Sequence, residues 1–158
     1  MIIIADSSTL IALLDAGRIS LLFDLFGTVV ITPEVYREIT VRDVHRETIT
    51  RWIVSGKLSL RSVAHDERYT MLIKRLDPGE SESIALAGQD GLPLIIDEKK
   101  GRSVARSLGI PIIGLVGIFL KLIDKDILSR AEAIVVVEKI EANGFRMSKE
   151  LKGLIHGN

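Results

Sequence analysis

The 158-residue chain contains no cysteine, and this absence excludes disulfide bonds, cysteine-based zinc sites and thiol catalysis. It also lacks an excess of charge of either sign, because 21 Lys and Arg residues balance 21 Asp and Glu residues. A protein that binds nucleic acid mainly through a large positive net charge is therefore excluded, whereas a local basic patch is compatible with the composition.

Long apolar runs are missing as well. No run approaches the roughly 20 residues that cross a membrane, and Ile2–Ile4 follow no basic segment of the kind that begins a signal peptide. We therefore expect a cytoplasmic protein with no membrane contact. Hydrophobic residues make up 47% of the chain, which is enough for a globular core, and the length fits one domain.

Short apolar runs rich in Ile or Val are present, and they alternate with helical stretches. Four of them predict strands, at Ile2–Ala5, Val29–Ile31, Leu94–Ile96 and Ile110–Ile113. Continuous apolar runs of this kind are typical of strands buried on both faces of a parallel sheet. A fifth segment, Leu58–Val63, alternates in polarity and predicts an edge strand.

Capping residues predict where several helices begin. Thr32 and Asp77 each precede a proline, and Ser129 with Glu132 has the spacing of a capping box, which predicts a helix that ends near Gly144. Further helices are expected over Leu10–Leu14, Ile19–Phe26, Arg42–Ile53, Arg68–Leu76, Arg102–Leu108, Leu115–Ile123 and Lys149–Ile155. The alternation of strands and helices predicts an α/β fold, a three-layer α/β/α sandwich with a mostly parallel sheet of four to five strands.

Acidic residues occupy informative positions in this pattern. Asp6 and Asp97 each come directly after a predicted strand. Because right-handed crossovers bring the carboxyl ends of parallel strands to one edge of the sheet, we expect these two carboxylates to converge. Glu80 and Glu82 lie in the first turn of one predicted helix, and Glu38 lies in the second turn of another.

A cluster of four or five carboxylates predicts a bound cation. Crowded carboxylates raise one another's pKa unless a cation lies between them. Mg²⁺ and Mn²⁺ are the hard cations that take oxygen ligands, so either is the expected cofactor. Zinc is not indicated, because His45, His65 and His156 lack the spacing of zinc ligands.

Each acidic residue also has a purely structural interpretation. Asp6 and Asp97 could cap the helices that follow them, and Glu80 could be half of a capping box. Glu82 could complement a helix dipole, and Glu38 could be a solvated surface residue. The functional interpretation depends on the coincidence of the whole set at one edge of the predicted sheet.

Four stretches carry these motifs in order. They are Ile4-Ala5-Asp6-Ser7-Ser8, Pro33-Glu34-Val35-Tyr36-Arg37-Glu38-Ile39, Gly79-Glu80-Ser81-Glu82-Ser83-Ile84-Ala85-Leu86-Ala87 and Leu94-Ile95-Ile96-Asp97-Glu98-Lys99-Lys100-Gly101-Arg102. Their order and spacing resemble the PIN-domain ribonucleases, specifically the VapC-like toxin branch, and residues 112–117 and 143–146 also fit. The resemblance implies a single PIN-like domain over residues 1–158, with the C-terminal helices of about 129–156 packed on it or extending it.

The resemblance assigns metal-binding and catalytic roles residue by residue. It implies that Asp6, Glu38 and Asp97 are three of the four acids. The remaining acid falls on Glu82 or Glu80, and the small residues that follow Glu82 favour Glu82.

Supporting residues follow from the same comparison. Ser7 or Ser8 matches a hydroxyl residue that supports the first acid, and Glu98 lies beside the fourth. Many relatives carry Thr or Ser just before the fourth acid, where this chain has Ile95-Ile96, so the number of bound ions, one or two, stays open.

The implied activity is Mg²⁺- or Mn²⁺-dependent hydrolysis of RNA phosphodiester bonds by water. Cationic side chains must then offset the negative field of the acids. The candidates for phosphate contacts are Lys99, Lys100, Arg102 and Arg106, with Arg37 a further candidate, and their alternative interpretation is a solvated helix face.

The resemblance also implies a toxin of a type II toxin–antitoxin pair, with a small antitoxin as partner and a homodimeric state. Two alternatives remain. One is a catalytically inactive PIN-like module that binds RNA or a protein. The other is a phosphatase or phosphotransfer domain, which the first motif disfavours because Ser8 occupies the place where a phosphatase needs a second aspartate.

Overall fold

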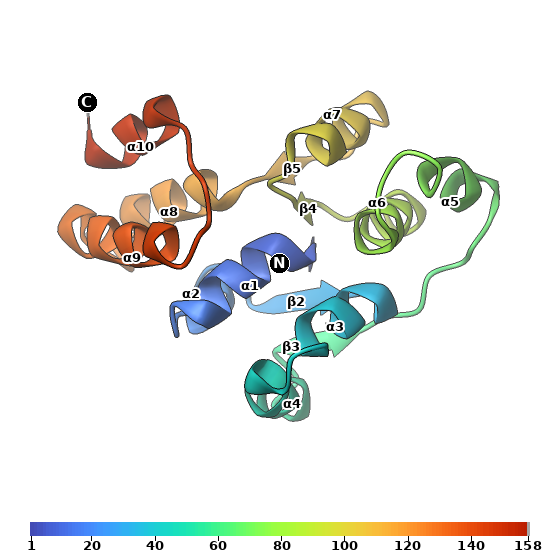
Figure 1. Ribbon diagram of the computed structural model, residues 1–158, viewed down its shortest axis with the longest axis horizontal. Helices are drawn as coiled ribbons and strands as arrows, with labels where there is room; N and C mark the ends of the chain where they lie inside the picture. Colours follow the sequence, from blue (N-terminus) through green and yellow to red (C-terminus); the bar gives the residue numbers. More distant parts are fainter. Residues whose placement is uncertain (158) are drawn as a thin grey trace.

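The computed structural model describes residues 1–157 and contains a five-stranded sheet in which all neighbouring strands are parallel. In sheet order the strands are β3 (Leu58–Leu60), β2 (Thr28–Ile31), β1 (Ile2–Ala5), β4 (Leu94–Ile95) and β5 (Ile112–Ile113). Helices lie on both sides of the sheet, so the predicted three-layer α/β/α fold with a parallel sheet is confirmed (Figure 1).

Two hydrophobic cores lie on opposite faces of the sheet. Alternate strand residues point to opposite faces, so Ile3 and Ala5 belong to one core and Ile4 to the other. The first core includes residues of α1 (Ser7–Asp15), α2 (Ser20–Phe26), α3 (Pro33–Thr40), α4 (Arg46–Val54), α8 (Leu115–Asp124), α9 (Arg130–Ala142) and α10 (Lys149–His156). The second core includes residues of α5 (Glu67–Leu72), α6 (Pro78–Asp90) and α7 (Lys99–Ser107). This burial on both faces explains why the strands are continuous apolar runs.

The capping residues begin their helices as predicted. The side chains of Thr32 and Asp77 each accept a hydrogen bond from a backbone N–H of the helix that follows. Ser129 and Glu132 form the complete capping box at the start of α9. These local interactions fix the starts of α3, α6 and α9 independently of the rest of the fold.

Three predicted strands are shorter in the structure, and the one predicted over Leu94–Ile96 ends one residue earlier, at Ile95. The strand predicted over Leu58–Val63 ends at Leu60 because its neighbour β2 ends at Ile31, whose carbonyl accepts the last bond from Arg61. The strand predicted over Ile110–Ile113 begins at Ile112, since the preceding Pro111 has no N–H to donate.

The helix predicted over Arg42–Ile53 is divided. Arg42 has extended backbone dihedral angles, a 3₁₀ turn follows at Asp43–His45, and α4 begins at Arg46. His45 is buried, and its Nε2 lies 2.6 Å from Asp15 Oδ1, so a tertiary contact with α1 fixes the turn that a sequence pattern does not reveal.

Three other helices begin before their predicted starts: α1 at Ser7, α5 at Glu67 and α7 at Lys99. Their first turns are polar, so an apolar pattern misses them. Among the described residues, no helix combines the length and apolar character needed to cross a membrane.

Candidate metal centre at the carboxyl edge of the sheet

Strands β1 and β4 bring Asp6 and Asp97 to the same edge of the sheet. Ala5 is paired with Ile95, and the N–H of Asp6 donates to the Ile95 carbonyl at 3.0 Å. Thr9 of α1 donates its hydroxyl to Asp97 Oδ2 at 2.7 Å. Helix α1, which starts directly after Asp6, therefore also holds the carboxylate of Asp97.

Asp6 is buried, with 3% of its surface exposed. Its Oδ1 is shielded from solvent and has no hydrogen-bond partner among residues 1–157. Burial raises the pKa of Asp6 to about 7, and the charges of Asp77, Glu38 and Glu98 add to the rise, against a lowering by the N–H of Ser7. A shielded carboxylate oxygen without a donor is a group that a cation would satisfy.

Glu80 lies in the same environment. It is 4% exposed, and its Oε2 likewise has no partner in the described part of the chain. Burial raises the pKa of Glu80 to about 9, and a hydrogen bond with Asp77 and the charges of Asp77, Asp6 and Glu98 contribute. Carboxylate oxygens of Asp77, Glu80 and Glu98 all lie within 4.8 Å of one another.

Asp77 is a site residue that sequence analysis missed. The sequence indicates only its capping role, which it performs through Oδ1 and the N–H of Glu80 at 2.8 Å. Asp77 and Glu98 are exposed, whereas Glu80 is buried, so the cluster is open to solvent on one side. The signal that could have found Asp77 is its place three residues before Glu80, because a cap residue lies beside the first turn of its helix.

Glu38 of α3 joins this group through Ser7. The hydroxyl of Ser7 donates to Glu38 Oε2 at 2.5 Å. Burial raises the pKa of Glu38, and the Ser7 hydroxyl partly offsets that rise. Ser7 thus supports Glu38, whereas the hydroxyl of Ser8 is shielded from solvent and unpartnered within the described chain.

Three of the acids rest against glycines. A Cβ at Gly79 would overlap the carboxylate of Glu38, and a Cβ at Gly101 would lie 2.5 Å from Glu80 Oε2. A Cβ at Gly114 would lie 2.9 Å from Asp97 Oδ1. The missing side chains therefore make the space that these carboxylates occupy.

Glu82, which the sequence favours over Glu80, has other contacts. Its Oε1 accepts the N–H of Glu34 at 2.9 Å, and its Oε2 lies 2.7 Å from His65 Nε2. Side chains two residues apart on an α-helix are separated by about 200° around the helix axis, so they point to nearly opposite sides. Of the two glutamates, Glu80 is therefore the one that the structure places beside Asp6 and Asp77.

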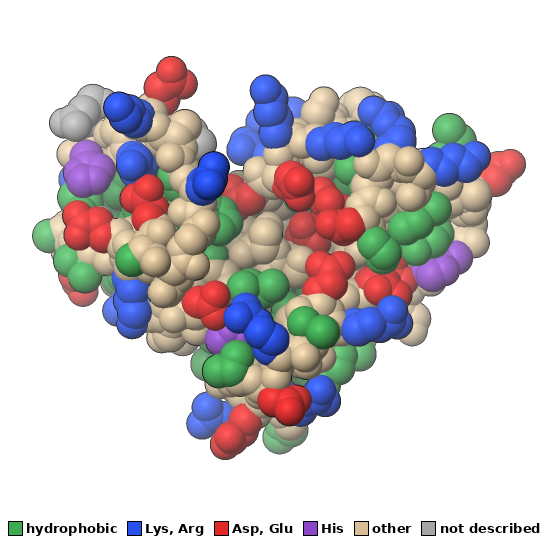
Figure 2. Space-filling view, viewed as in Figure 1, with side chains coloured by type: hydrophobic (Ala, Val, Ile, Leu, Met, Phe, Trp, Pro, Cys, Tyr) green, Lys and Arg blue, Asp and Glu red, His purple; other side chains and the backbone are tan. Residues whose placement is uncertain are grey.

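Basic residues border the acidic cluster along α7. Lys99, Lys100 and Arg106 are exposed, while Arg102 is half-buried, and its charge lowers the pKa of Asp97 against the upward effect of burial. Acidic side chains gather in the middle of the face shown in Figure 2, with Lys and Arg side chains over α7 above them. Arg37 instead pairs with Glu34 at 2.8 Å on the solvent side of α3.

These residues fit a hard divalent cation. All the donors are carboxylate oxygens, which Mg²⁺ and Mn²⁺ prefer, and two of them are shielded and unpartnered within residues 1–157. The exposed carboxylates of Asp77 and Glu98 provide a path of entry for an ion.

A PIN-domain family model matches residues 2–156, so the chain belongs to the PIN-domain family. The matching model is the one designated DUF3368. The fold is also similar to that of a solved PilT N-terminus domain protein from the hyperthermophilic archaeon Sulfolobus solfataricus P2, with a TM-score of 0.51 and 14% sequence identity. That similarity covers 94% of this chain and 98% of the archaeal chain, and at this identity it concerns the fold alone. No curated protein matches the sequence at a significant level.

Proposed function

We propose that this chain is an endoribonuclease that depends on Mg²⁺ or Mn²⁺. The observation that carries the proposal is a pair of shielded carboxylate oxygens: Glu80 Oε2, in the cluster with Asp77 and Glu98 that opens to solvent, and Asp6 Oδ1, on which the charges of Asp77 and Glu98 act. No hydrogen-bond partner for either oxygen exists among the described residues. Membership of the PIN-domain family supports the proposal, because PIN domains are typically nucleases.

In this proposal Asp6 and Glu80 hold the ion from the buried side, and Asp77 and Glu98 hold it from the open side. A bound divalent ion would supply charge neutralisation at the phosphate and an activated water for hydrolysis. One ion accounts for this donor set.

The remaining acids shape the wall of the site. Ser7 fixes the carboxylate of Glu38, and Thr9 with the N–H of Leu115 fixes that of Asp97. Because these side chains are held by hydrogen bonds, the site is organised before substrate arrives, which lowers the cost of ordering it. Glu38 and Asp97 would orient water by accepting its hydrogen bonds.

The substrate in this proposal is RNA, whose phosphates need cations beside so many acids. Lys99, Lys100 and Arg106 are exposed on α7, next to the cluster, and would contact phosphates on one side of the cut. Such contacts strengthen binding without reading sequence, and their contribution falls with rising salt.

The resemblance to VapC-like toxins extends the proposal to a type II toxin–antitoxin pair, with a small antitoxin partner, a homodimer and a cytoplasmic location. Expression of the chain would then arrest growth, and the product of a small neighbouring open reading frame would relieve the arrest. Normal growth of cells that contain RNA-cleaving protein would count against the toxin role while leaving the nuclease proposal standing.

The purified protein is expected to cleave RNA in the presence of Mg²⁺ or Mn²⁺ and to stop when EDTA is added in excess. Readdition of Mn²⁺ to the same sample should restore cleavage, which controls for damage by the chelator. Cleavage that continues unchanged in EDTA contradicts the metal-dependent mechanism. Metal-dependent RNA binding without any cleavage would favour the inactive, RNA-binding alternative.

Gly79→Ala is expected to reduce cleavage by about tenfold or more, because the new methyl group displaces the carboxylate of Glu38 from its place beside Ser7. Folding should change little, since only the flexible end of a side chain must move. The rate of RNA cleavage and the melting temperature measure the two effects.

Gly88→Ala is the matched control for this variant. It lies in the same helix, and its Cβ would overlap only the guanidinium of the exposed Arg68. Gly88→Ala should retain wild-type cleavage. Equal losses in the two variants would mean that a general disturbance of α6, and not the position of Glu38, explains the result.

A further inference from the structure

A cavity of about 260 Å³ adjoins the acidic cluster on the side of the edge strand β5. Asp97 lines it and directly precedes Glu98 of the acidic cluster. The rest of its wall includes Arg102 of α7, Ile112 of β5, Val116 of α8 and Leu154 of α10. Figure 2 shows a notch in the surface between the part over α10 and the part over α7.

The two ends of this cavity differ in chemistry. Asp97 and Arg102 make one end charged, whereas the other walls are aliphatic. The Nε of Arg102 is shielded from solvent and has no acceptor within residues 1–157. Arg102 itself lines this end of the cavity, so a ligand that brings an anionic oxygen to its guanidinium would be favoured there.

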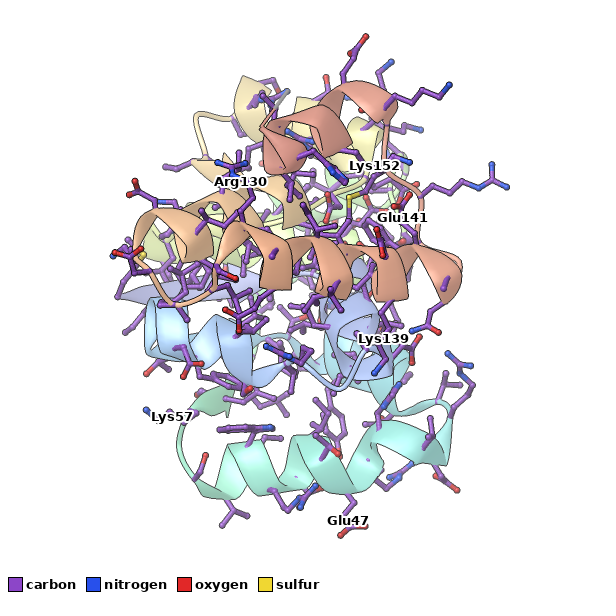
Figure 3. The ribbon with its side chains drawn as sticks, turned by 90° about the vertical axis from the view of Figure 1, so that its left-hand side faces the viewer. Glu47, Lys57, Arg130, Lys139, Glu141 and Lys152 are labelled. Atoms are coloured by element: carbon purple, nitrogen blue, oxygen red, sulfur yellow. The ribbon has the colours of Figure 1, made fainter. Side chains whose placement is uncertain are left out.

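The aliphatic wall contributed by α10 is held in place from outside the cavity. Arg130 of α9 donates through Nη1 to the carbonyl of Leu154 at 3.1 Å and also to that of Ile155. Lys152 lies 3.2 Å from Glu141 of α9. Figure 3 shows Arg130, Lys152 and Glu141 where α9 and α10 adjoin. These contacts keep Leu154, which is 51% exposed, at the mouth of the cavity.

We propose that this cavity is a nucleotide subsite, which takes the base of a nucleotide next to the cleaved bond and places its phosphate against Arg102. The subsite rests on the proposed function, because it adjoins the acids that would cut the RNA. A nucleotide joins a flat apolar ring to an anion, and this cavity joins aliphatic walls to the guanidinium of Arg102. An apolar peptide side chain would fill the walls but would bring no anionic group to the guanidinium of Arg102.

Binding of mononucleotides to the metal-free protein tests the subsite separately from cleavage. Nucleoside 5′-monophosphates and ribose 5-phosphate are titrated in EDTA, while the methyl NMR signals of Ile112, Ile113 and Leu154 are followed. We expect the monophosphates to shift these signals and ribose 5-phosphate to leave them unchanged, since it has the phosphate but no base. Equal shifts with both ligands, or shifts only at methyl groups elsewhere, would overturn the subsite.

Leu154→Glu places a carboxylate at the mouth of the cavity, and Leu108→Glu is its matched control. Leu108 is 44% exposed and lines a different surface hollow, between α5 and α7. Leu154→Glu should weaken nucleotide binding about fivefold or more, because it replaces part of the aliphatic wall with a carboxylate that repels the anionic ligand. Leu108→Glu should bind as the wild type does. Equal weakening in both variants would overturn the proposal.

RNA cleavage then separates this proposal from the nuclease proposal. An oligonucleotide with one abasic position beside the cut should have a KM raised about fivefold or more for the wild type, and this penalty should disappear in Leu154→Glu. An abasic penalty that persists in Leu154→Glu would overturn the subsite while the nuclease proposal stands. Absence of any RNA cleavage, together with base-dependent shifts at Ile112 and Leu154, would overturn the nuclease proposal and leave a nucleotide-binding cavity.

Discussion

Asp6→Asn is expected to abolish RNA cleavage and, at the same time, to stabilise the metal-free protein. The substitution removes a charged oxygen from the proposed metal site, which should lower cleavage by about a hundredfold or more. It also removes a buried negative charge that lies among other carboxylates. Cleavage assays and thermal unfolding in EDTA measure the two effects, and Asp24→Asn, a change at an exposed position of α2, is the control.

The stabilisation by Asp6→Asn should depend on pH in a defined direction. The pKa of Asp6 is raised from 3.8 to about 7 in the folded chain, so folding favours the protonated form. The stability that this preference contributes is fully present below pH 3.8 and is lost as the pH rises through about 7. A shift of this size corresponds to at most about 4 kcal/mol.

The metal-free wild type should therefore be more stable near pH 5 than near pH 8. Asp6→Asn should make this difference in stability smaller. Part of the difference should remain, because the pKa of Glu80 is raised as well. Near pH 8 the variant should melt several degrees higher than the wild type. A lower melting temperature for Asp6→Asn at that pH would indicate that Asp6 has a structural role instead.

Glu80→Gln is expected to lower cleavage by about a hundredfold, whereas Glu82→Gln should keep most of the activity. Glu80 offers a shielded oxygen with no partner among the described residues, beside Asp6 and Asp77. Both oxygens of Glu82 already have partners, Glu34 and His65. The loss at Glu80 is thus the loss of a ligand, whereas the change at Glu82 affects hydrogen bonds with Glu34 and His65.

The two variants are matched, since both change a buried glutamate of the same helix to its amide. Cleavage rates at saturating Mg²⁺, together with the affinity for Mn²⁺, measure the difference. A larger loss in Glu82→Gln than in Glu80→Gln would return the third metal-binding role to Glu82 and would contradict the ligand set proposed above.

The sequence predicted the sheet and its edge because those features depend on local composition. Continuous runs such as Ile2–Ala5 are typical of strands buried on both faces, and parallel strands joined by right-handed crossovers align their carboxyl ends. The position of Asp6 and Asp97 at the same edge of the sheet follows from that alignment. The length of β5 was harder to predict, because it depends on a single missing donor at Pro111.

The sequence could not predict which glutamate of the Gly-Glu-x-Glu turn, Glu80 or Glu82, lies beside Asp6. Glu80 and Glu82 have the same chemistry, and only the rotation of α6 about its axis decides which one faces Asp6. That rotation is set by packing of the whole helix against the sheet. Asp77 was missed for a related reason, since its capping role is visible locally and its approach to Glu98 is not.

The central place of β1 has a consequence for synthesis of the protein on the ribosome. The first strand to emerge is paired with β4, a segment some ninety positions later, where Ile4 meets Leu94. Asp6 and Asp97 therefore stay apart in any nascent chain that has not yet reached this segment. Under the proposed function, a growing polypeptide of this kind lacks part of its set of acids, so an unfinished copy would leave its own messenger intact.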